Sequence, residues 1–367
     1  MSTGIRWLSV PPGSGFGDAS EAYRDGLRAA GVPVGWTPLG YPSTEWDAPY
    51  GPVEAADPSF EHDRVVVSST PLWHDRLRAD ANGLLLATYT MWETDRVPGE
   101  YVTLLNRYDR VLVPTRFNAE IFESSGVVPP LHVVPQIARR PLIPLPARER
   151  DGTFVFYVIG TWTTRKAILD VVAAYLAAFT RGDDVRLLIH TTPEDLVAVQ
   201  RGAAPHERAT AFTLAKALAG RQEAPQIKLS TRSLTREEVE NLHANGDCFV
   251  LLSRGEGWGL GAFDAAVFGN PSIVTGWGAT AEFLPEDYPY LVDYDLVATV
   301  TDEADFWWRP RAGERWARAR IDHAATLLRR VYEQQDEARE WGGVLQHELT
   351  TRFAAPTVTR RLLDALA

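Results

Sequence analysis

The sequence predicts an α/β protein with two Rossmann-like domains that face a central cleft. Short apolar runs that suit buried strands alternate with helical patterns in both halves of the chain. A segment with three prolines and clustered charge, residues 139–152, separates the halves and has the composition of a domain boundary. At 367 residues the chain is also too long for one ordinary hydrophobic core. We therefore expect one domain at residues 1–145 and a second at residues 146–349.

The first half begins with a strand, a glycine-rich loop and a helix. Residues 5–10 predict the strand, residues 11–18 the loop, and residues 19–30 a helix that ends at Gly31. The loop fits a phosphate site and a tight turn equally well, because its glycines do not follow the dinucleotide fingerprint. The other predicted elements of this half are strands at 32–37, 64–68, 83–89, 110–114 and 131–135 and helices at 101–107 and 118–124.

The second half repeats the alternation. Its predicted strands are 154–159, 185–190, 226–229, 248–252 and 272–274, and its predicted helices are 167–180, 209–219, 235–244 and 260–268. Thr235 and Glu238 have the spacing of a capping box at the start of one helix. Residues 289–292 are expected to be extended, residues 314–348 show helical spacing, and residues 357–367 predict a terminal helix.

Two glycine-bearing turns follow strands of the second half, at residues 160–166 and 255–259. In an open parallel sheet such turns gather at one edge, where ligands bind, and helix N-termini at that edge attract anions. Arg165 and Lys166 in the first turn suit a diphosphate, although two basic residues on a surface turn would also be solvated there.

Two carboxylates accompany the second turn. Glu256 lies between glycines, where a carboxylate has little use in packing. Asp264 follows about two helical turns later, so it either faces the same ligand or is an ordinary polar residue of the helix surface. Together the two turns suggest the donor half of a sugar-transfer site.

Composition limits the partners and the compartment. The formal net charge is −11, from 37 basic and 48 acidic residues, which disfavours nucleic acid and anionic membranes. No apolar stretch approaches the ~20 residues that span a bilayer, and the N-terminus lacks the apolar segment of a secretion signal. The single cysteine, Cys248, excludes an intrachain disulfide and is expected in the core. We therefore expect a cytoplasmic protein.

The order of these motifs resembles that of the retaining GT-B glycosyltransferases of family 4 (glycosyl transferases group 1). That family carries a serine, an acidic residue, Gly-aromatic-Gly-Leu and a second carboxylate, which match residues 253–260 and Asp264 here. Lys166 matches the family's phosphate-binding lysine, and residues 276–282 and 92–98 also follow the family's order. The resemblance covers most of the chain and is strongest over residues 154–300.

The resemblance implies a nucleotide-diphosphate sugar as co-substrate, with no other cofactor and no metal, and a C-terminal helix, 350–367, that crosses back to the first domain. Glu256 would contact the sugar hydroxyls and Asp264 the ribose, while Arg165 and Lys166 would neutralise the diphosphate, and these last two with Glu256 are the expected catalytic residues. The expected donor-binding residues are Gly15, Gly160, Thr161, Arg232, Ser233, Leu234, Gly257, Trp258, Gly259, Leu260 and Asp264.

The acceptor is expected to be a glycan, a lipid-linked compound or a small molecule. Variable loops of the first domain, at residues 13–18, 40–63 and 90–98, would meet it. The expected acceptor-side residues are Phe16, Thr90, Trp92 and Glu93.

Three positions depart from the family pattern. Asp264 replaces the usual glutamate, and Thr161 stands five residues before the lysine where the family has arginine, so Arg165 would have to substitute. The family's histidine near the sugar has no clear match, and Glu93 or Thr90 is the candidate for that region. These departures leave open an alternative function, a non-catalytic nucleotide- or sugar-binding partner subunit. A dinucleotide oxidoreductase is disfavoured because neither domain has Gly-x-Gly-x-x-Gly after its first strand.

Overall fold

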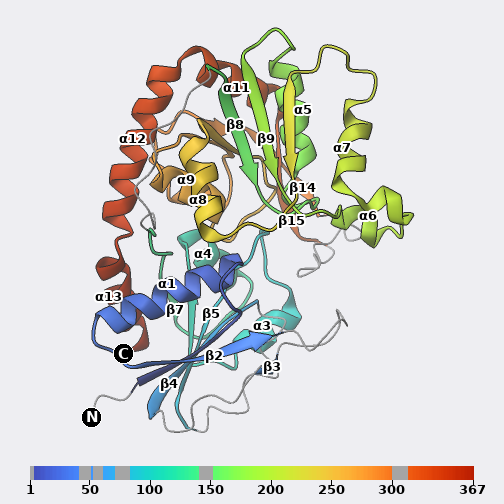
Figure 1. Cartoon of the computed structure of the whole chain (residues 1–367). Helices are drawn as coiled ribbons and strands as arrows, with labels where there is room; N and C mark the ends of the chain where they lie inside the picture. Colours follow the sequence, from blue (N-terminus) through green and yellow to red (C-terminus); the bar gives the residue numbers. More distant parts are fainter. Residues whose placement is uncertain (1–3, 41–50, 53–60, 71–82, 140–151, 300–312) are drawn as a thin grey trace. The chain divides into compact units, whose positions relative to one another are not determined.

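The computed structural model describes residues 4–40, 51–52, 61–70, 83–139, 152–299 and 313–367. The chain divides into two compact units (Figure 1). Unit 1 consists of Met1–Trp92, Arg96–Arg139 and Thr351–Ala367, and unit 2 consists of Glu93–Asp95 and Arg140–Thr350. The predicted boundary segment, 139–152, lies outside the described residues except at its two ends.

Unit 1 is built on a sheet with the strand order β3-β2-β1-β4-β5-β6-β7 in its described part. The strands are β1 (Gly4–Ser9), β2 (Val34–Gly40), β3 (Gly51–Pro52), β4 (His62–Ser68), β5 (Leu85–Tyr89), β6 (Arg110–Val113) and β7 (Leu131–Val133). The two-residue β3 pairs antiparallel with β2, and the other pairs are parallel. The order reverses between β1 and β4, and this is the point where an open α/β sheet binds ligands beyond the carboxyl ends of its strands.

The helices of unit 1 are α1 (Gly15–Ala29), α3 (Gly99–Leu105), α4 (Arg116–Ser124) and the terminal α13 (Ala355–Leu366). Helix α13 lies against α1, where a Cβ atom on Gly26 would come within 2.3 Å of Thr359 Oγ1. The amide of Ala138 donates to the carbonyl oxygen of Phe353 at 2.9 Å, just before α13 begins. The end of the chain therefore packs in unit 1, as predicted.

Unit 2 has the strand order β10-β9-β8-β11-β12-β13, and all of its described strand pairs in this sheet are parallel. The strands are β8 (Phe154–Ile159), β9 (Val185–His190), β10 (Gln226–Ser230), β11 (Cys248–Leu251), β12 (Ser272–Thr275) and β13 (Leu291–Val292). The order reverses between β8 and β11, and open α/β sheets commonly bind ligands at such a point. Two Rossmann-like α/β units confirm the predicted fold class, and Cys248 is buried as expected.

Helices surround the sheet of unit 2 (Figure 1). They are α5 (Ile168–Ala178), α6 (Leu196–Gln200), α7 (Thr210–Leu218), α8 (Arg236–Asn245), α9 (Leu260–Val267), α10 (Ala279–Glu282), α11 (Ile321–Glu333) and α12 (Gln335–Arg352), with a 3₁₀ helix at Pro205–Arg208. The capping box of Thr235 and Glu238 is present at the start of α8. None of the described helices combines the length and the apolar content needed to cross a membrane.

A buried polar network joins strand β8 to helix α8 and to the residues that follow helix α9. The Tyr157 hydroxyl lies 2.9 Å from His243 Nδ1 of α8, and the Asn270 amide donates to the same hydroxyl at 2.8 Å. Asn270 also donates to the carbonyl oxygen of His243 at 2.6 Å. A buried polar group that loses its hydrogen bond is costly, so such a network favours the one arrangement of its elements in which these bonds form. It holds α8 and the end of α9 in register with β8.

One predicted element is wrong. Residues 314–319 were expected to begin the helical segment 314–348, but Arg315–Ala319 form strand β15, which pairs antiparallel with β14 (Tyr294–Ala298). The helix begins only at Ile321. Trp316 is fully buried, so pairing and side-chain burial outweigh the helical spacing of alanine and arginine here. The antiparallel hairpin lies outside the main sheet of unit 2.

The close packing of α12 in unit 2 can be tested with two adjacent glycines. A Cβ atom on Gly342 would come within 2.1 Å of the backbone oxygen of Gly269, whereas a Cβ on Gly343 would meet nothing within 4 Å. We expect Gly342→Ala to destabilise the protein by about 1–3 kcal/mol, since backbone atoms cannot move aside cheaply. Gly343→Ala should be neutral or stabilising by up to about 1 kcal/mol, because alanine favours a helix interior. Thermal unfolding midpoints measure both, and equal midpoints for the two variants would contradict this packing.

Candidate functional site

Two strand-to-helix turns of unit 2 meet where the strand order reverses. One turn follows β8 and the other follows β11, and these strands are neighbours in the sheet. The amide of Arg254 donates to the carbonyl oxygen of Arg165 at 2.7 Å, so the two turns are joined directly through their backbones. Residues about ninety positions apart in the sequence are therefore brought together at the edge of the sheet where open α/β folds commonly bind ligands.

An ion cluster occupies this point. Lys166 Nζ donates to both carboxylate oxygens of Glu256, at 2.7 and 3.0 Å. Arg165 Nη1 lies 3.4 Å from Glu256 Oε2 and donates to the carbonyl oxygen of Gly255 at 2.9 Å. Glu256 is only 6% exposed. A carboxylate so far removed from water is stable in its ionised form only when cations and hydrogen bonds compensate it.

The electrostatics of Glu256 follow from these contacts. Burial raises the pKa of the Glu256 carboxyl, but Lys166 and Arg165 lower it, as do the hydrogen bonds from Lys166 and Ser253, and the resulting pKa lies below the ordinary value of 4.5. Glu256 is therefore an anion at neutral pH. As an acceptor-only group, it can receive hydrogen bonds from ligand hydroxyls.

The backbone around Lys166 is strained. Ala167 has a φ of 49° and is the only non-glycine residue in the left-handed region among those that the structure describes. Its amide and that of Lys166 bond to the carbonyl and the hydroxyl oxygen of Thr163, both at 3.2 Å. Such a conformation costs roughly 1–3 kcal/mol and is held by the surrounding contacts. Ala167 ends the turn and is the N-cap of α5, which begins at Ile168.

The second turn depends on glycine. Gly259 has a φ of 88°, and a Cβ atom there would lie 2.3 Å from Thr280 Oγ1. Trp258 is buried, with its ring 4.9 Å from that of Phe263 and 5.4 Å from that of Phe283. The tryptophan therefore anchors the turn in the core, and a ligand at this turn would meet residues 257–259 through their backbones.

The other predicted donor-binding residues of unit 2 lie along the same edge of the sheet. Gly160 and the exposed Thr161 belong to the turn of Lys166, and Leu260 begins α9, which carries the half-buried Asp264. Residues 232–234 follow β10, two strands from β8, or about 10 Å along the sheet. Arg232 is exposed and bonds to Glu238 of the capping box. The structure thus gathers the two turns closely and places residues 232–234 further along the edge.

The predicted residues of unit 1 are placed by their own sheet. Gly15 and Phe16 begin α1, after β1, at the point where the strand order of unit 1 reverses. Thr90 and Trp92 follow β5 and are buried, and the Trp92 ring packs 5.2 Å from that of Tyr101. The packing of Trp92 makes it a core residue of unit 1. Of the predicted acceptor loop 40–63, residues 41–50 and 53–60 lie outside the described part of the chain.

Glu93, expected on the acceptor side, belongs to unit 2. A Cβ atom on Gly255 would come within 1.9 Å of the Glu93 carbonyl oxygen, so the two backbones touch. The Glu93 carboxylate lies 4.0 Å from Arg165 Nη1. The structure thus adds a second carboxylate to the surroundings of Arg165.

Arg254, for which the sequence predicted no role, contacts the ion cluster through its amide, which donates to the Arg165 carbonyl oxygen. The Arg254 guanidinium lies 5.4 Å from the Trp316 ring centre and 3.8 Å from Asp170 Oδ2. Burial lowers the pKa of Arg254, although Asp170 opposes this, and burial likewise raises the pKa of Asp170. The position of Arg254 between Ser253 and Gly255 of the motif was the only sequence signal for it.

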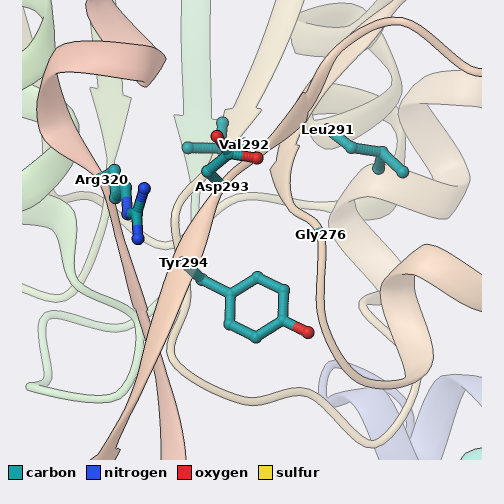
Figure 2. Close-up of a pocket in the computed structure, with 6 residues that line it drawn as sticks. All are labelled: Gly276, Leu291, Val292, Asp293, Tyr294 and Arg320. Atoms are coloured by element: carbon teal, nitrogen blue, oxygen red, sulfur yellow. The ribbon is translucent and has the colours of Figure 1, made fainter.

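A hollow of about 480 Å³ lies beyond the carboxyl ends of β12 and β13 (Figure 2). Its lining residues are Gly276, Leu291, Val292, Asp293, Tyr294 and Arg320. None of these belongs to the ion cluster, and Arg320 is paired with Asp295 at 3.0 Å. The buried carboxylate of Glu256 and the two cations that contact it therefore lie outside this hollow.

Known protein structures share this fold. HepE from Anabaena, solved with UDP and glucose, aligns over 99% of both chains with a TM-score of 0.68 and 12% identity. Sucrose-phosphate synthase from Thermosynechococcus elongatus aligns over 99% of this chain and 98% of its own, with a TM-score of 0.68 and 14% identity. TarM from S. aureus has a TM-score of 0.58 and 10% identity over 82% of this chain, which spans only 55% of the TarM chain. At such identities the likeness shows the fold alone.

Sequence comparisons give the family. Comparison with curated proteins found no match. The model of the family described as "Family 4 Glycosyltransferase in conflict systems" matches residues 112–360, which is more than half of the chain and includes both turns of the ion cluster. The chain therefore belongs to this family of glycosyltransferases.

Proposed function

We propose that the protein transfers a sugar from a nucleotide-diphosphate sugar to a hydroxyl-bearing acceptor, with retention of the anomeric configuration and without a metal ion. The convergence of Arg165 and Lys166 on Glu256 at the switch point of unit 2 carries this proposal. Two cations and one ionised carboxylate suit a ligand that combines a diphosphate with a hydroxyl-rich sugar.

The diphosphate is the leaving group of this reaction. Negative charge grows on it as the bond to the sugar breaks, and cations fixed in place stabilise that charge in the transition state. Lys166 and Arg165 are held in advance by Glu256 and by the carbonyl oxygen of Gly255. The amides at the start of α9, after Gly259, add partial positive charge beside them. In this proposal these residues supply the positive charge that a metal ion supplies in other transferases.

The sugar and the ribose would bind on the carboxylate side of the cluster. Glu256 would accept hydrogen bonds from sugar hydroxyls, since its lowered pKa keeps it ionised. Asp264, one turn into α9, would accept from the ribose, and residues 232–234 would lie toward the base. The residues proposed for the acceptor are those that follow β1 and β5.

Uracil is the base we propose. HepE and TarM were both solved with UDP, and an E. coli structure of the same fold was solved with UDP-2-fluoro glucose. Each likeness shows a common fold, so the base is carried over here as a proposal.

A second candidate is a binding subunit that holds nucleotide and sugar without transferring them. Asp264 and Thr161 favour it, since both depart from the family pattern at positions that would face the donor. Donor binding without transfer or hydrolysis would support this candidate over the first.

The role of Lys166 can be tested by nucleotide binding. We expect Lys166→Ala to weaken UDP binding by tenfold to a hundredfold, because a charged hydrogen bond contributes about 1.5–3 kcal/mol. Isothermal titration calorimetry measures the affinity. Lys216→Ala removes an equal charge from the exposed surface of α7 and serves as the matched control, with unchanged affinity. Equal affinities for wild type and Lys166→Ala would remove the lysine from the site.

The role of Glu256 can be tested by turnover. We expect Glu256→Gln to lower the rate of UDP-glucose hydrolysis or transfer by roughly 10²–10³, the typical loss for a transition-state contact. The wild-type rate should be unchanged in EDTA, and NMR of the product should show the anomeric configuration of the donor. Glu286→Gln, on the exposed surface, is the control. Full activity of Glu256→Gln would contradict the assigned role, and loss of wild-type activity in EDTA would contradict metal independence.

The ionisation of Glu256 predicts a pH dependence of stability. Its pKa is lower in the folded protein than the ordinary 4.5, so its contribution to the free energy of unfolding is present above that value. The contribution is lost as the pH falls through the lower folded pKa. We therefore expect wild type to unfold at a higher temperature than Glu256→Gln at pH 7, with a difference that shrinks below about pH 4. A difference that stays constant from pH 7 to pH 3 would contradict the lowered pKa.

A further inference from the structure

The segment Glu93–Asp95 leaves unit 1 and is built into unit 2. Thr94 Oγ1 donates to Glu314 Oε2 at 2.6 Å, and both residues are buried. The amide and the side chain of Arg315 donate to Asp95 at 2.7 and 2.9 Å, and the Asp95 amide donates to the Arg315 carbonyl oxygen at 3.0 Å. These bonds anchor the segment on the β14–β15 hairpin.

The anchoring holds the backbone of Glu93 beside the ion cluster. The Glu93 carbonyl oxygen rests on Gly255, where a side chain larger than hydrogen would collide with it. The carboxylate is then 4.0 Å from Arg165 Nη1, and its side chain is only 17% exposed. Arg165 thus lies between two carboxylates, those of Glu93 and Glu256. The side chains of Arg165 and Glu93 are 14% and 17% exposed, and charges at such distances interact strongly where water screens them little.

We propose that Glu93 is a positioning residue that shares Arg165 with the diphosphate and weakens the hold of the site on the free nucleoside diphosphate. This inference rests on the proposed function, because it takes the cluster as the diphosphate site. A bound diphosphate would compete with Glu93 for the interaction with the Arg165 guanidinium. It would also be repelled by the negative charge of Glu93.

The effect of Glu93 differs between substrate and product. In the donor, the terminal phosphate is esterified to the sugar and carries one negative charge. After transfer it is a free terminal phosphate, whose second pKa of about 6 gives it most of a second charge at neutral pH. A fixed anion nearby therefore penalises the product more than the donor. Glu93 thus favours release of the diphosphate, a step that often limits turnover in enzymes.

Calorimetry with UDP and UDP-glucose tests this inference. We expect Glu93→Gln to bind UDP about tenfold more tightly than wild type, the change that corresponds to about 1.4 kcal/mol, and to gain less affinity for UDP-glucose. The gain should shrink at high ionic strength, because it is electrostatic. Glu93→Asp keeps the charge and should bind UDP within about twofold of wild type. Glu286→Gln changes the net charge equally on the exposed surface and should also match wild type.

The outcomes separate this inference from the proposed function. If wild type binds UDP and Glu93→Gln binds it equally or more weakly, the inference is wrong while the proposed function stands. If wild type binds neither UDP nor UDP-glucose, the proposed function fails first. Circular dichroism shows whether each variant is folded, and Glu93→Ala gives the same change of charge if the glutamine variant is unfolded.

Discussion

The contact between Lys166 and Glu256 is the interaction on which the site depends. It requires that β8 and β11 be neighbours, since the two residues leave the sheet from the ends of these strands. The order β10-β9-β8-β11-β12-β13 provides this, because the crossovers run outward from β8 in one direction and then from β11 in the other. The buried Tyr157 on β8 also holds this strand in place, through the hydrogen bonds of its hydroxyl with His243 and Asn270.

Burial and charge oppose each other at Glu256. Its 6% exposure would favour the neutral acid, and the neighbouring cations, together with the hydrogen bonds from Lys166 and Ser253, reverse this. The Glu256 carboxylate in turn stabilises Lys166 and Arg165, whose positive charges would repel each other without it. The two cations are thus held in place before any ligand binds, and in the proposed function little of the binding energy of a phosphate would be spent on ordering them. The strained φ of Ala167 belongs to this preorganisation, since it ends the turn next to Lys166.

Local sequence signals predicted most of the parallel strands and the residues of the two turns. The apolar runs 154–159 and 185–190 match β8 and β9 at both ends, and the Thr235 capping box starts α8. Arg165, Lys166 and Glu256 were singled out because glycine turns after strands predict a common edge. The β14–β15 hairpin was missed because its strands are about twenty residues apart and only their pairing makes them extended. The placement of Glu93 in unit 2 was missed for a similar reason, since the Thr94–Glu314 bond spans 220 positions.

The β14–β15 hairpin, which the sequence did not predict, contacts both Arg254 and the Glu93–Asp95 segment. The Ala317 amide of β15 donates to the Arg254 carbonyl oxygen at 2.8 Å, and the Arg254 amide donates to the Arg165 carbonyl oxygen at 2.7 Å. Two residues earlier, Arg315 holds Asp95 and with it the segment of Glu93. The hairpin therefore fixes Arg165 through the backbone and the carboxylate beside it through the Glu93–Asp95 segment. Strand β15 therefore contacts both the Arg254 backbone that binds Arg165 and the segment that carries Glu93.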